Sequence, residues 1–261
     1  MEYEKLTQRE KRWYSRQIML EGIGTGGQEK IKNARILVIG AGGLGCSILQ
    51  YLTVSGMGHI GIAEFDMVNE SNLQRQVLYG SNDVGKLKSI IAKNRLADLN
   101  SFVNFEIFNL KVDASNALRV MEGFDMIIDA TDNFEARYII NDSCVVLNKP
   151  MVHGSIYKWE GMVSVFNYKG GPTYRCFNPR RPDKNFRNPA PADVGLFGIL
   201  PGLTGMLMTN EIIKITTQTG NVLSGKALLF NISTNTFRTF AIKNVPGNHN
   251  AEYLKSLSDN L

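Results

Sequence analysis

The strongest constraint on the fold is a glycine-rich turn that directly follows a short apolar run. Residues 35–39 read RILVI, residues 40–45 read GAGGLG, and residues 44–55 then show helical spacing. A buried parallel strand, a tight turn and a helix begin a βαβ unit, in which free N–H groups and the partial positive charge of the helix N-terminus attract phosphate. The turn therefore predicts an α/β fold that binds a nucleotide.

The glycines of this turn have separate expected roles. Gly40 and Gly42 permit tight backbone geometry and close approach of a phosphate, whereas Gly45 lets the helix pack against the strand. The strand that follows ends near Glu64 and Asp66. Glu64 stands at about the spacing, roughly 20 residues on, at which an acid binds a ribose diol. Because NAD and ATP both carry phosphates and a ribose, the turn does not distinguish between them.

The remaining chain first continues the alternation of strands and helices and then changes to a pattern typical of antiparallel strands. Further strands are predicted at residues 103–108, 126–130 and 151–155, and helices at 83–99, 114–121 and 134–147. Beyond residue 157 we expect an alternating antiparallel strand at 161–168, an apolar helix within 195–217 and two strands joined by a turn within 226–243. The predicted fold class is α/β: a Rossmann-like doubly wound sheet, parallel in its N-terminal half and continued by antiparallel strands into a mixed sheet.

No linker divides these parts, so we expect a single nucleotide-binding domain over residues 1–245. Its expected parts are an N-terminal helical arm (residues 1–33), a Rossmann-like half (34–157) and an antiparallel part (158–245). A mobile Pro-rich loop is expected within the antiparallel part, at residues 178–193. A flexible polar tail is expected over residues 246–261.

Composition narrows the function classes. The chain is 43% hydrophobic and 20% charged with a net charge of +5, which is an ordinary soluble composition. No run approaches the roughly 18 apolar residues of a membrane span, and the polar N-terminus has no secretory signal. Three scattered cysteines fit a reduced, cytoplasmic setting. Nucleic-acid binding is not expected, because no long basic run is present.

A polar segment, SNLQRQ at residues 71–76, favours ATP over NAD. A dehydrogenase has no need for an Asn and an Arg together just after the ribose-binding acid. Arg75 and Lys88 can meet over a triphosphate, one as a planar fork and one as a point charge. Asp132 follows a later parallel strand and would face the same crevice, where Mg²⁺ must bridge an acid and a polyphosphate. An NAD-dependent oxidoreductase remains an alternative on the glycine turn alone.

Taken together, the motifs resemble those of the ThiF/MoeB/HesA family over roughly residues 10–245. The matching segments, in family order, are Tyr14–Gln17, the glycine turn, Ser71–Gln76, Lys88, Thr131–Asn133 and the Gly-x-x-Gly-x-x-Pro-Gly run at Gly195–Gly202. The resemblance implies adenylation of the C-terminal glycine of a small ubiquitin-like sulfur carrier, such as ThiS or MoaD. It implies MgATP as the co-substrate, pyrophosphate as a product, and a place in molybdopterin or thiamine biosynthesis.

The resemblance also implies a set of site residues. The expected catalytic residues are Arg16, Arg75, Lys88 and Asp132, with Asp132 as the Mg²⁺ ligand. The expected nucleotide-binding residues are Gly40, Gly42, Gly43, Gly45, Glu64, Asp66, Ser71, Asn72, Leu73, Gln74, Arg75, Lys88, Asp132 and Asn133. Arg16 resembles an arginine that reaches into the partner subunit's site, which implies a homodimer. One departure is that the ribose position is usually Asp, whereas this chain has Glu64.

Two features common in the family are missing. Only Cys176 remains of the two Cys-x-x-Cys pairs that hold a structural zinc, so no zinc site is expected. The loop position near Pro191, where sulfur-handling members often carry a cysteine, has no thiol. Adenylation does not require that thiol, but thioester or acyl-disulfide formation on this chain is put in doubt. Cys176 is the one candidate reactive thiol, and a structural role is the preferred interpretation.

Other functions stay open at this point. A non-catalytic ATP- or carrier-binding relative is compatible with the missing zinc and thiol positions. A related enzyme that adenylates a tRNA or a peptide has the same nucleotide requirements. The sequence does not identify the carrier, and therefore does not choose between the two pathways.

Overall fold

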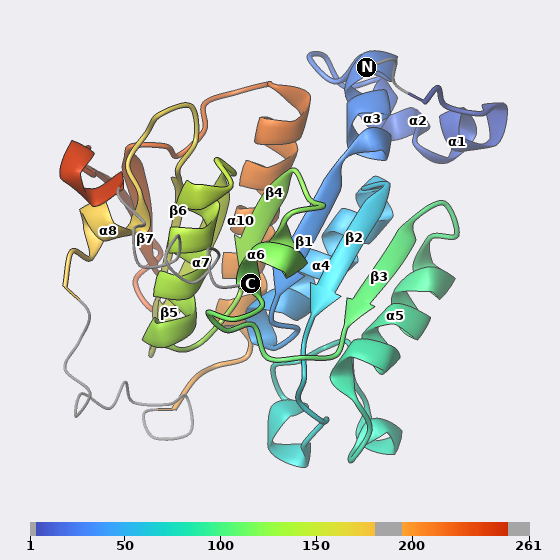
Figure 1. Cartoon of the computed structure of the whole chain (residues 1–261). Helices are drawn as coiled ribbons and strands as arrows, with labels where there is room; N and C mark the ends of the chain where they lie inside the picture. The colour runs from blue at the N-terminus through green and yellow to red at the C-terminus, as the bar shows by residue number, and fades with distance from the viewer. Residues whose placement is uncertain (1–3, 181–194, 250–261) are drawn as a thin grey trace.

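The computed structural model describes residues 4–180 and 195–249, which build one eight-stranded mixed sheet with helices on both faces (Figure 1). The strand order is β3-β2-β1-β4-β5-β6-β7-β8. The first five strands in that order run parallel, and the last three are added by antiparallel pairing. The predicted mixed Rossmann-like sheet is confirmed.

The parallel half of the sheet is buried on both sides at its inner strands. Its members are β1 (Arg35–Ile39), β2 (His59–Ala63), β3 (Asn104–Phe108), β4 (Met126–Asp129) and β5 (Met151–Tyr157). In β1, Ile36 and Val38 belong to the core on one face of the sheet, and Leu37 and Ile39 to the core on the other. Because both faces are covered, the run RILVI shows no polar alternation.

The antiparallel strands are β6 (Glu160–Phe166), β7 (Lys226–Asn231) and β8 (Thr236–Ala241). The hairpin of β5 and β6 pairs Tyr157 with Glu160, and β7 and β8 pair Asn231 with Thr236. β8 forms the exposed edge of the sheet. The two strands predicted within residues 226–243 are therefore present, with the turn between them.

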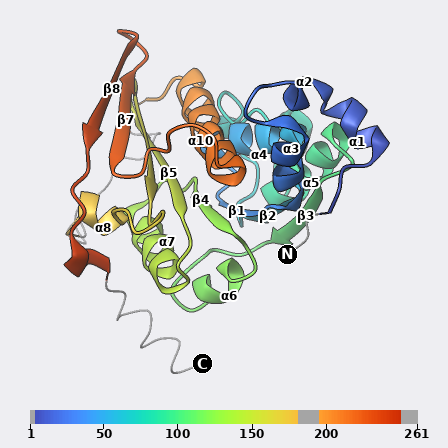
Figure 2. The same cartoon turned by 90° about the horizontal axis from the view of Figure 1, so that it is seen from above.

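The helices cover the sheet unevenly (Figure 2). One face carries α3 (Gly24–Asn33), α4 (Gly43–Ser55), α5 (Lys88–Leu99) and α10 (Ile199–Thr217), and the other carries α6 (Ala117–Met121), α7 (Phe134–Val146) and the short α8 (Tyr174–Phe177). Among the described residues, the 3₁₀ turns η1 (Glu70–Asn72) and η2 (Ser81–Asp83) lie between β2 and α5, and η3 (Pro246–His249) follows β8. No helix in the described ranges is both long and apolar enough to cross a membrane.

The N-terminal arm contains α1 (Gln8–Trp13) and α2 (Ser15–Ile18), and Tyr14 between them anchors it. Tyr14 is 2% exposed, and its hydroxyl accepts a hydrogen bond from Asn100 Nδ2 at 2.8 Å. A Cβ on Gly56, which has a φ of 84°, would lie 2.4 Å from the Tyr14 ring. The arm therefore packs at the amino ends of the parallel strands, where α4 and α5 finish.

Two details differ from the sequence-based expectation. The helix predicted from residue 83 begins at Lys88, with Leu87 as its N-cap. The Asp83 carboxylate instead accepts the Gly80 N–H at 2.8 Å and pairs with Arg95, so Asp83 closes η2. In the segment expected to be a flexible tail, residues 246–249 form η3, and the rest lies outside the described residues. Most of the predicted mobile loop also lies outside them.

The close packing of α4 on β1 generates a stability prediction. A Cβ on Gly45 would lie 2.1 Å from the Gly40 carbonyl oxygen, so Gly45→Ala must displace the backbone. We expect a loss of about 2 kcal/mol in the free energy of unfolding, measured by urea titration. Gly26→Ala is the matched control, because Gly26 lies in α3 and a Cβ there would meet nothing within 4 Å. That control should raise stability by up to about 1 kcal/mol; an unchanged midpoint for Gly45→Ala would contradict the packing argument.

Candidate active site

A crevice opens at the carboxyl ends of the parallel strands, where the sheet changes winding direction between β1 and β4. The chain leaves β1 into α4 on one face and leaves β4 into α7 on the other, so the two loops separate there. In α/β sheets this is the place where ligands bind. The crevice is lined by the residues that follow β1, β2, β3 and β4, by the end of β5, by Arg75, Gln76 and Lys88, and by Gly195 and Leu196.

The glycine turn forms one wall of the crevice. Gly40 has a φ of 99°, and a Cβ on Gly45 would collide with its carbonyl, so both residues serve the turn and the helix packing. A Cβ on Gly42 would meet one side-chain atom within 4 Å, at 3.6 Å. A Cβ on Gly43, the first residue of α4, would lie 3.0 Å from the Cβ of Pro201. Gly42 is thus open to a ligand, whereas Gly43 also provides close contact with α10.

Glu64 ties the glycine turn to the loop after β2. It is 6% exposed; Oε2 accepts the Ala41 N–H at 2.8 Å, and Oε1 accepts the N–H groups of Phe65 and Asp66 at 2.8 and 2.9 Å. A carboxylate offers about four acceptor positions. Three are used by the protein, and one on Oε2 is left for a ribose hydroxyl.

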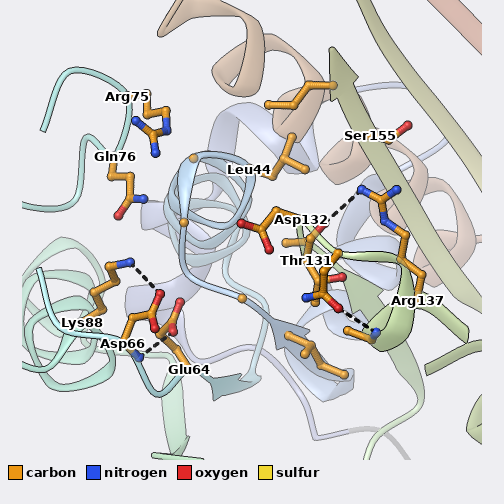
Figure 3. Close-up of a pocket in the computed structure, with 18 of the residues that line it drawn as sticks. Leu44, Glu64, Asp66, Arg75, Gln76, Lys88, Thr131, Asp132, Arg137 and Ser155 are labelled. Atoms are coloured by element: carbon orange, nitrogen blue, oxygen red, sulfur yellow. Dashed lines mark hydrogen bonds and ion pairs between the residues drawn. The ribbon is translucent and has the colours of Figure 1, made fainter. Parts of the chain in front are cut away.

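Two predicted cations lie on the same side of the crevice (Figure 3). Lys88 begins α5 with its side chain only 5% exposed, and its Nζ lies 3.2 Å from Asp66 Oδ2. Asp66 is half-exposed, so the Lys88 ammonium has one carboxylate partner that faces solvent. Arg75 donates from Nη1 to the Ser71 carbonyl at 3.0 Å. Both cations line the crevice, as an anion-binding role requires.

The rest of the polar segment shapes its own loop. Asn72 Oδ1 accepts the Asn69 N–H at 3.3 Å, and Ser71 Oγ donates to Asn69 Oδ1 at 2.8 Å. Gln74 Nε2 donates to the Ser71 carbonyl, and Leu73 packs against the core. Within the described chain, the crevice lining contains none of these four predicted residues, Ser71, Asn72, Leu73 and Gln74. Ser71, Asn72 and Gln74 make the hydrogen bonds given above within their own turn, and their part in nucleotide binding stays a prediction.

Gln76, the last residue of the same segment, was not among the predicted site residues and lines the crevice. It is 5% exposed, and its Oε1 has no hydrogen-bond partner among the described residues. Its Nε2, rather than its Oε1, lies toward the glycine turn, 3.6 Å from where a Cβ on Gly42 would be. Its position directly after Arg75 is the signal that could have identified it.

The turn after β4 brings Asp132 to the crevice. Asp132 is exposed there, and Figure 3 shows its carboxylate directed toward the middle of the crevice. Asn133, predicted to bind the nucleotide, is the N-cap of α7, and its Oδ1 accepts the Ala136 N–H at 2.9 Å. Carboxylate oxygens such as those of Asp132 are ligands that suit Mg²⁺. The donor set therefore fits the predicted metal, with Asp132 as the residue that would hold it.

Arg137 is a further cation at the crevice that sequence reasoning missed. It is 8% exposed; its Nη2 donates to the Thr131 carbonyl at 3.4 Å, and its Cζ lies 5.2 Å above the Phe134 ring. Its Nε is buried without a partner in the described chain. Figure 3 shows Arg137 beside Ser155, across Asp132 from the first two cations. Its place in α7, one turn after the N-cap, is a spacing that could have predicted it.

A buried, hydrogen-bonded pair of Asp129 and His153 lies beneath the Asp132 turn. His153 on β5 pairs in register with Asp129 at the end of β4, and Nδ1 lies 2.7 Å from Asp129 Oδ2. Burial alone would raise the pKa of the Asp129 carboxyl, but the His153 hydrogen bond and the nearby Arg137 charge hold it below its ordinary value. Burial also lowers the pKa of His153, despite the attraction of Asp129. At neutral pH the pair is therefore a carboxylate and a neutral imidazole.

Arg16 does not line this crevice. It is an exposed residue of α2, and its neighbour Tyr14 contacts Asn100 at the C-terminal end of α5. Lys88, which lines the crevice, lies at the N-terminal end of the same helix. At 1.5 Å per residue, the 12 residues of α5 separate the two places by about 18 Å. Arg16 therefore lies at the opposite end of the sheet from its own crevice (Figure 1).

The cysteines are absent from the described residues that line the crevice. Cys46 and Cys144 are buried, and burial raises the pKa of the Cys46 thiol to about 12. Cys176 Sγ accepts the Val245 N–H at 3.4 Å, while His249 Nε2 contacts Asn244 Oδ1. Within the part of the chain that is described, no three metal-ligating side chains cluster. At this position Asn248 joins η3 to α8 by hydrogen bonds to Thr173 and Arg175.

Comparison with solved structures agrees with this fold. The Escherichia coli MccB structure with MccA-N7isoASN superposes with a TM-score of 0.80 over 90% of this chain and 73% of that chain, at 22% identity. The structure of PaaA superposes with a TM-score of 0.77 over 93% of this chain and 86% of that chain, at 22% identity. MccB has also been solved with ATP, at a TM-score of 0.75 to this chain.

Sequence comparison identifies the family. A sulfur carrier protein adenylyltransferase from Thermus thermophilus is 41% identical over 89% of this chain and 88% of its own length. A probable molybdopterin-synthase adenylyltransferase from Porphyra purpurea is 45% identical over 88% of this chain but 60% of its own length. An adenylyltransferase and sulfurtransferase from Xenopus laevis is 41% identical, and the chain covers 51% of it. The sequence profile of the ThiF family matches residues 14–250, and the chain belongs to that family.

Proposed function

We propose that this protein uses ATP to adenylate the C-terminal glycine of a small ubiquitin-like sulfur carrier, MoaD-like or ThiS-like, in molybdopterin or thiamine biosynthesis. The observation that carries the proposal is one crevice that gathers Arg75, Lys88 and Asp132 around the N-terminus of α4. The relatives named as adenylyltransferases of sulfur carrier protein and of molybdopterin synthase support the same reaction. We propose a cytoplasmic location, in keeping with the scattered free cysteines.

The chemistry requires alignment and charge neutralisation rather than a general base. An oxygen of the carrier's terminal carboxylate, ionised at neutral pH, forms a bond to the α-phosphorus of ATP. The bond from that phosphorus to the bridging oxygen breaks, and pyrophosphate leaves with the electron pair. The two reactants repel each other, so cations near the phosphates lower the barrier most. Lys88 and Arg75 are suited to the phosphates, and the free N–H groups at the start of α4 add to them.

Each remaining group in the crevice has a role that its surroundings support. The open acceptor position on Glu64 suits a ribose hydroxyl. Asp132 would hold Mg²⁺, which when bound neutralises phosphate charge and favours departure of pyrophosphate. Arg137, across Asp132 from the phosphate-binding cations, suits the incoming carboxylate of the carrier.

Arg16 can take part only if a second copy supplies it. Its own crevice is about 18 Å away along α5. Beside it, Met19 and Leu20 are 74% and 62% exposed, which is a large apolar surface for residues of a single copy. We therefore propose a homodimer in which Arg16 of one protomer enters the partner's crevice and stabilises the transferring phosphate.

Two crevice side chains should be indispensable to the reaction. Asp132→Ala and Arg75→Ala should each lower carrier-dependent ATP–pyrophosphate exchange by about 100-fold or more, because each removes a group that offsets charge in the transition state. The measurement is radiolabel exchange with MoaD-like and ThiS-like carriers ending in Gly-Gly. Asp98→Ala on the exposed side of α5 and Arg119→Ala on α6 are matched controls that should retain wild-type exchange. Near-normal exchange in either crevice variant would remove the site assignment.

The same assay separates the competing functions. Tight ATP binding by the wild-type protein without exchange on any carrier would indicate a non-catalytic binding relative. Exchange driven by a peptide or a tRNA, with none from the carriers, would indicate a related adenylating enzyme with another substrate.

Mixed dimers test the contribution of Arg16 in trans. Arg16→Ala and Asp132→Ala should each be inactive alone, but after unfolding and refolding together they should form mixed dimers with one complete crevice. Random pairing of equal amounts gives about a quarter of wild-type activity. Mixing Asp132→Ala with Arg75→Ala is the control, because both changes lie in one crevice and no mixed dimer is complete. Failure of the first mixture to recover activity would rule out the shared site.

A further inference from the structure

The buried pair of Asp129 and His153 has no part in the proposed chemistry, yet both side chains are fully enclosed and tightly paired. They are 0% and 1% exposed, and they face each other across β4 and β5. Burying a carboxylate beside a neutral imidazole is weak evidence for stability, because packed apolar side chains of similar volume often do as well. A carboxylate placed fully inside the protein at this point therefore calls for another explanation.

The Asp129 carboxylate accepts hydrogen bonds from the turn above it and from His153. Its Oδ1 accepts the Thr131 N–H at 3.0 Å and the Thr131 Oγ–H at 2.6 Å. Its Oδ2 is 2.7 Å from His153 Nδ1. An ionised carboxylate only accepts hydrogen bonds, so Nδ1 carries the proton of the neutral imidazole. His153 thus fixes the orientation of Asp129, and Asp129 fixes Thr131.

Thr131 is held at every polar atom. Its N–H and hydroxyl bind Asp129, and its carbonyl accepts from Arg137 Nη2 at 3.4 Å. The residue on the other side of Asp132 is also held, because Asn133 caps α7. The peptide of Asp132 is therefore suspended between two anchored neighbours, while its side chain reaches the crevice (Figure 3).

We propose that His153 and Asp129 are positioning residues, which hold the Thr131–Asp132 turn so that the Asp132 carboxylate is preorganised to bind Mg²⁺. The inference rests on the proposed function in that it takes Asp132 as the metal ligand. Partners that orient a metal ligand from behind typically change metal affinity or activity by about 10- to 100-fold when lost. Hydrogen bonding by His153, rather than its bulk, is the property that matters.

A pair of variants isolates that hydrogen bond. His153→Asn keeps an amide N–H close to the position of Nδ1, whereas His153→Leu removes the donor, and both lose the imidazole ring. The readout is the ratio of ATP dissociation constants without and with Mg²⁺, measured by calorimetry on the full chain in EDTA and in excess MgCl₂. His153→Leu should reduce this ratio by about tenfold relative to the wild-type protein, whereas His153→Asn should retain most of the wild-type ratio. Amide hydrogen exchange of Thr131 should quicken in the Leu variant alone.

Thr131→Val and Thr131→Ser form an independent pair that keeps the buried histidine. Thr131→Val preserves the branched shape and removes the hydroxyl donor. It should therefore lower the ratio of ATP dissociation constants without and with Mg²⁺ by about tenfold. Ser keeps the donor and should recover most of the effect. This pair carries the test if either change at His153 prevents folding, as judged by thermal melting.

The outcomes separate this inference from the proposed function. The inference would be overturned if His153→Leu and His153→Asn showed equal Mg²⁺ dependence of ATP binding, and Thr131→Val and Thr131→Ser did too, whatever their melting temperatures. Asp129 and His153 would then be merely structural. ATP binding by the wild-type protein that ignores Mg²⁺ would overturn it as well. A Mg²⁺ effect that follows the hydrogen bond, combined with no exchange on any carrier, would sustain the inference and reject the proposed substrate.

Discussion

The architecture depends on how closely α4 approaches β1. At Gly45 there is no room for a single methyl group, since that atom would lie 2.1 Å from the Gly40 carbonyl oxygen. This approach aims the N-terminus of α4 at the crevice and leaves its first N–H groups without partners in the helix. Glu64 then fixes the turn to the neighbouring loop through backbone N–H groups of both. The N-terminus of α4 thus adds partial positive charge to the crevice wall before any cationic side chain is considered.

Charged side chains divide the crevice into two sides with Asp132 between them. Lys88 and Arg75 stand on the side of the glycine turn, and Arg137 stands beyond Asp132 near Ser155. Such a division suits a reaction between two anions, because each anion has its own cation and a metal-binding carboxylate lies where they meet. The buried Asp129 and His153 support that central carboxylate from below. The fold and the chemistry thus meet at the ends of β1 and β4.

Much of this fold could be predicted from sequence because its signals are local. The run at β1 and the turn after it are read directly from residue order, as are the strands at the C-terminal end. Side-chain direction in loops was harder, because no periodicity governs it: Arg75 reaches the crevice, while Ser71 and its neighbours satisfy their own turn. Arg137 depends on where α7 begins, and the pairing of Asp129 with His153 depends on strand register. Strand register joins residues that are far apart in the sequence, so no single short segment encodes the pairing of Asp129 with His153.

The most direct test of the central claim is a crystal structure of the protein with Mg²⁺ and α,β-methylene ATP, an analogue that cannot release pyrophosphate. The account predicts a triphosphate at the N-terminus of α4, within hydrogen-bond distance of Lys88 and Arg75. It also predicts a magnesium ion between the phosphates and Asp132, and a ribose hydroxyl on Glu64. A triphosphate bound away from Gly42 and Lys88, or a metal ion without Asp132 among its ligands, would contradict it.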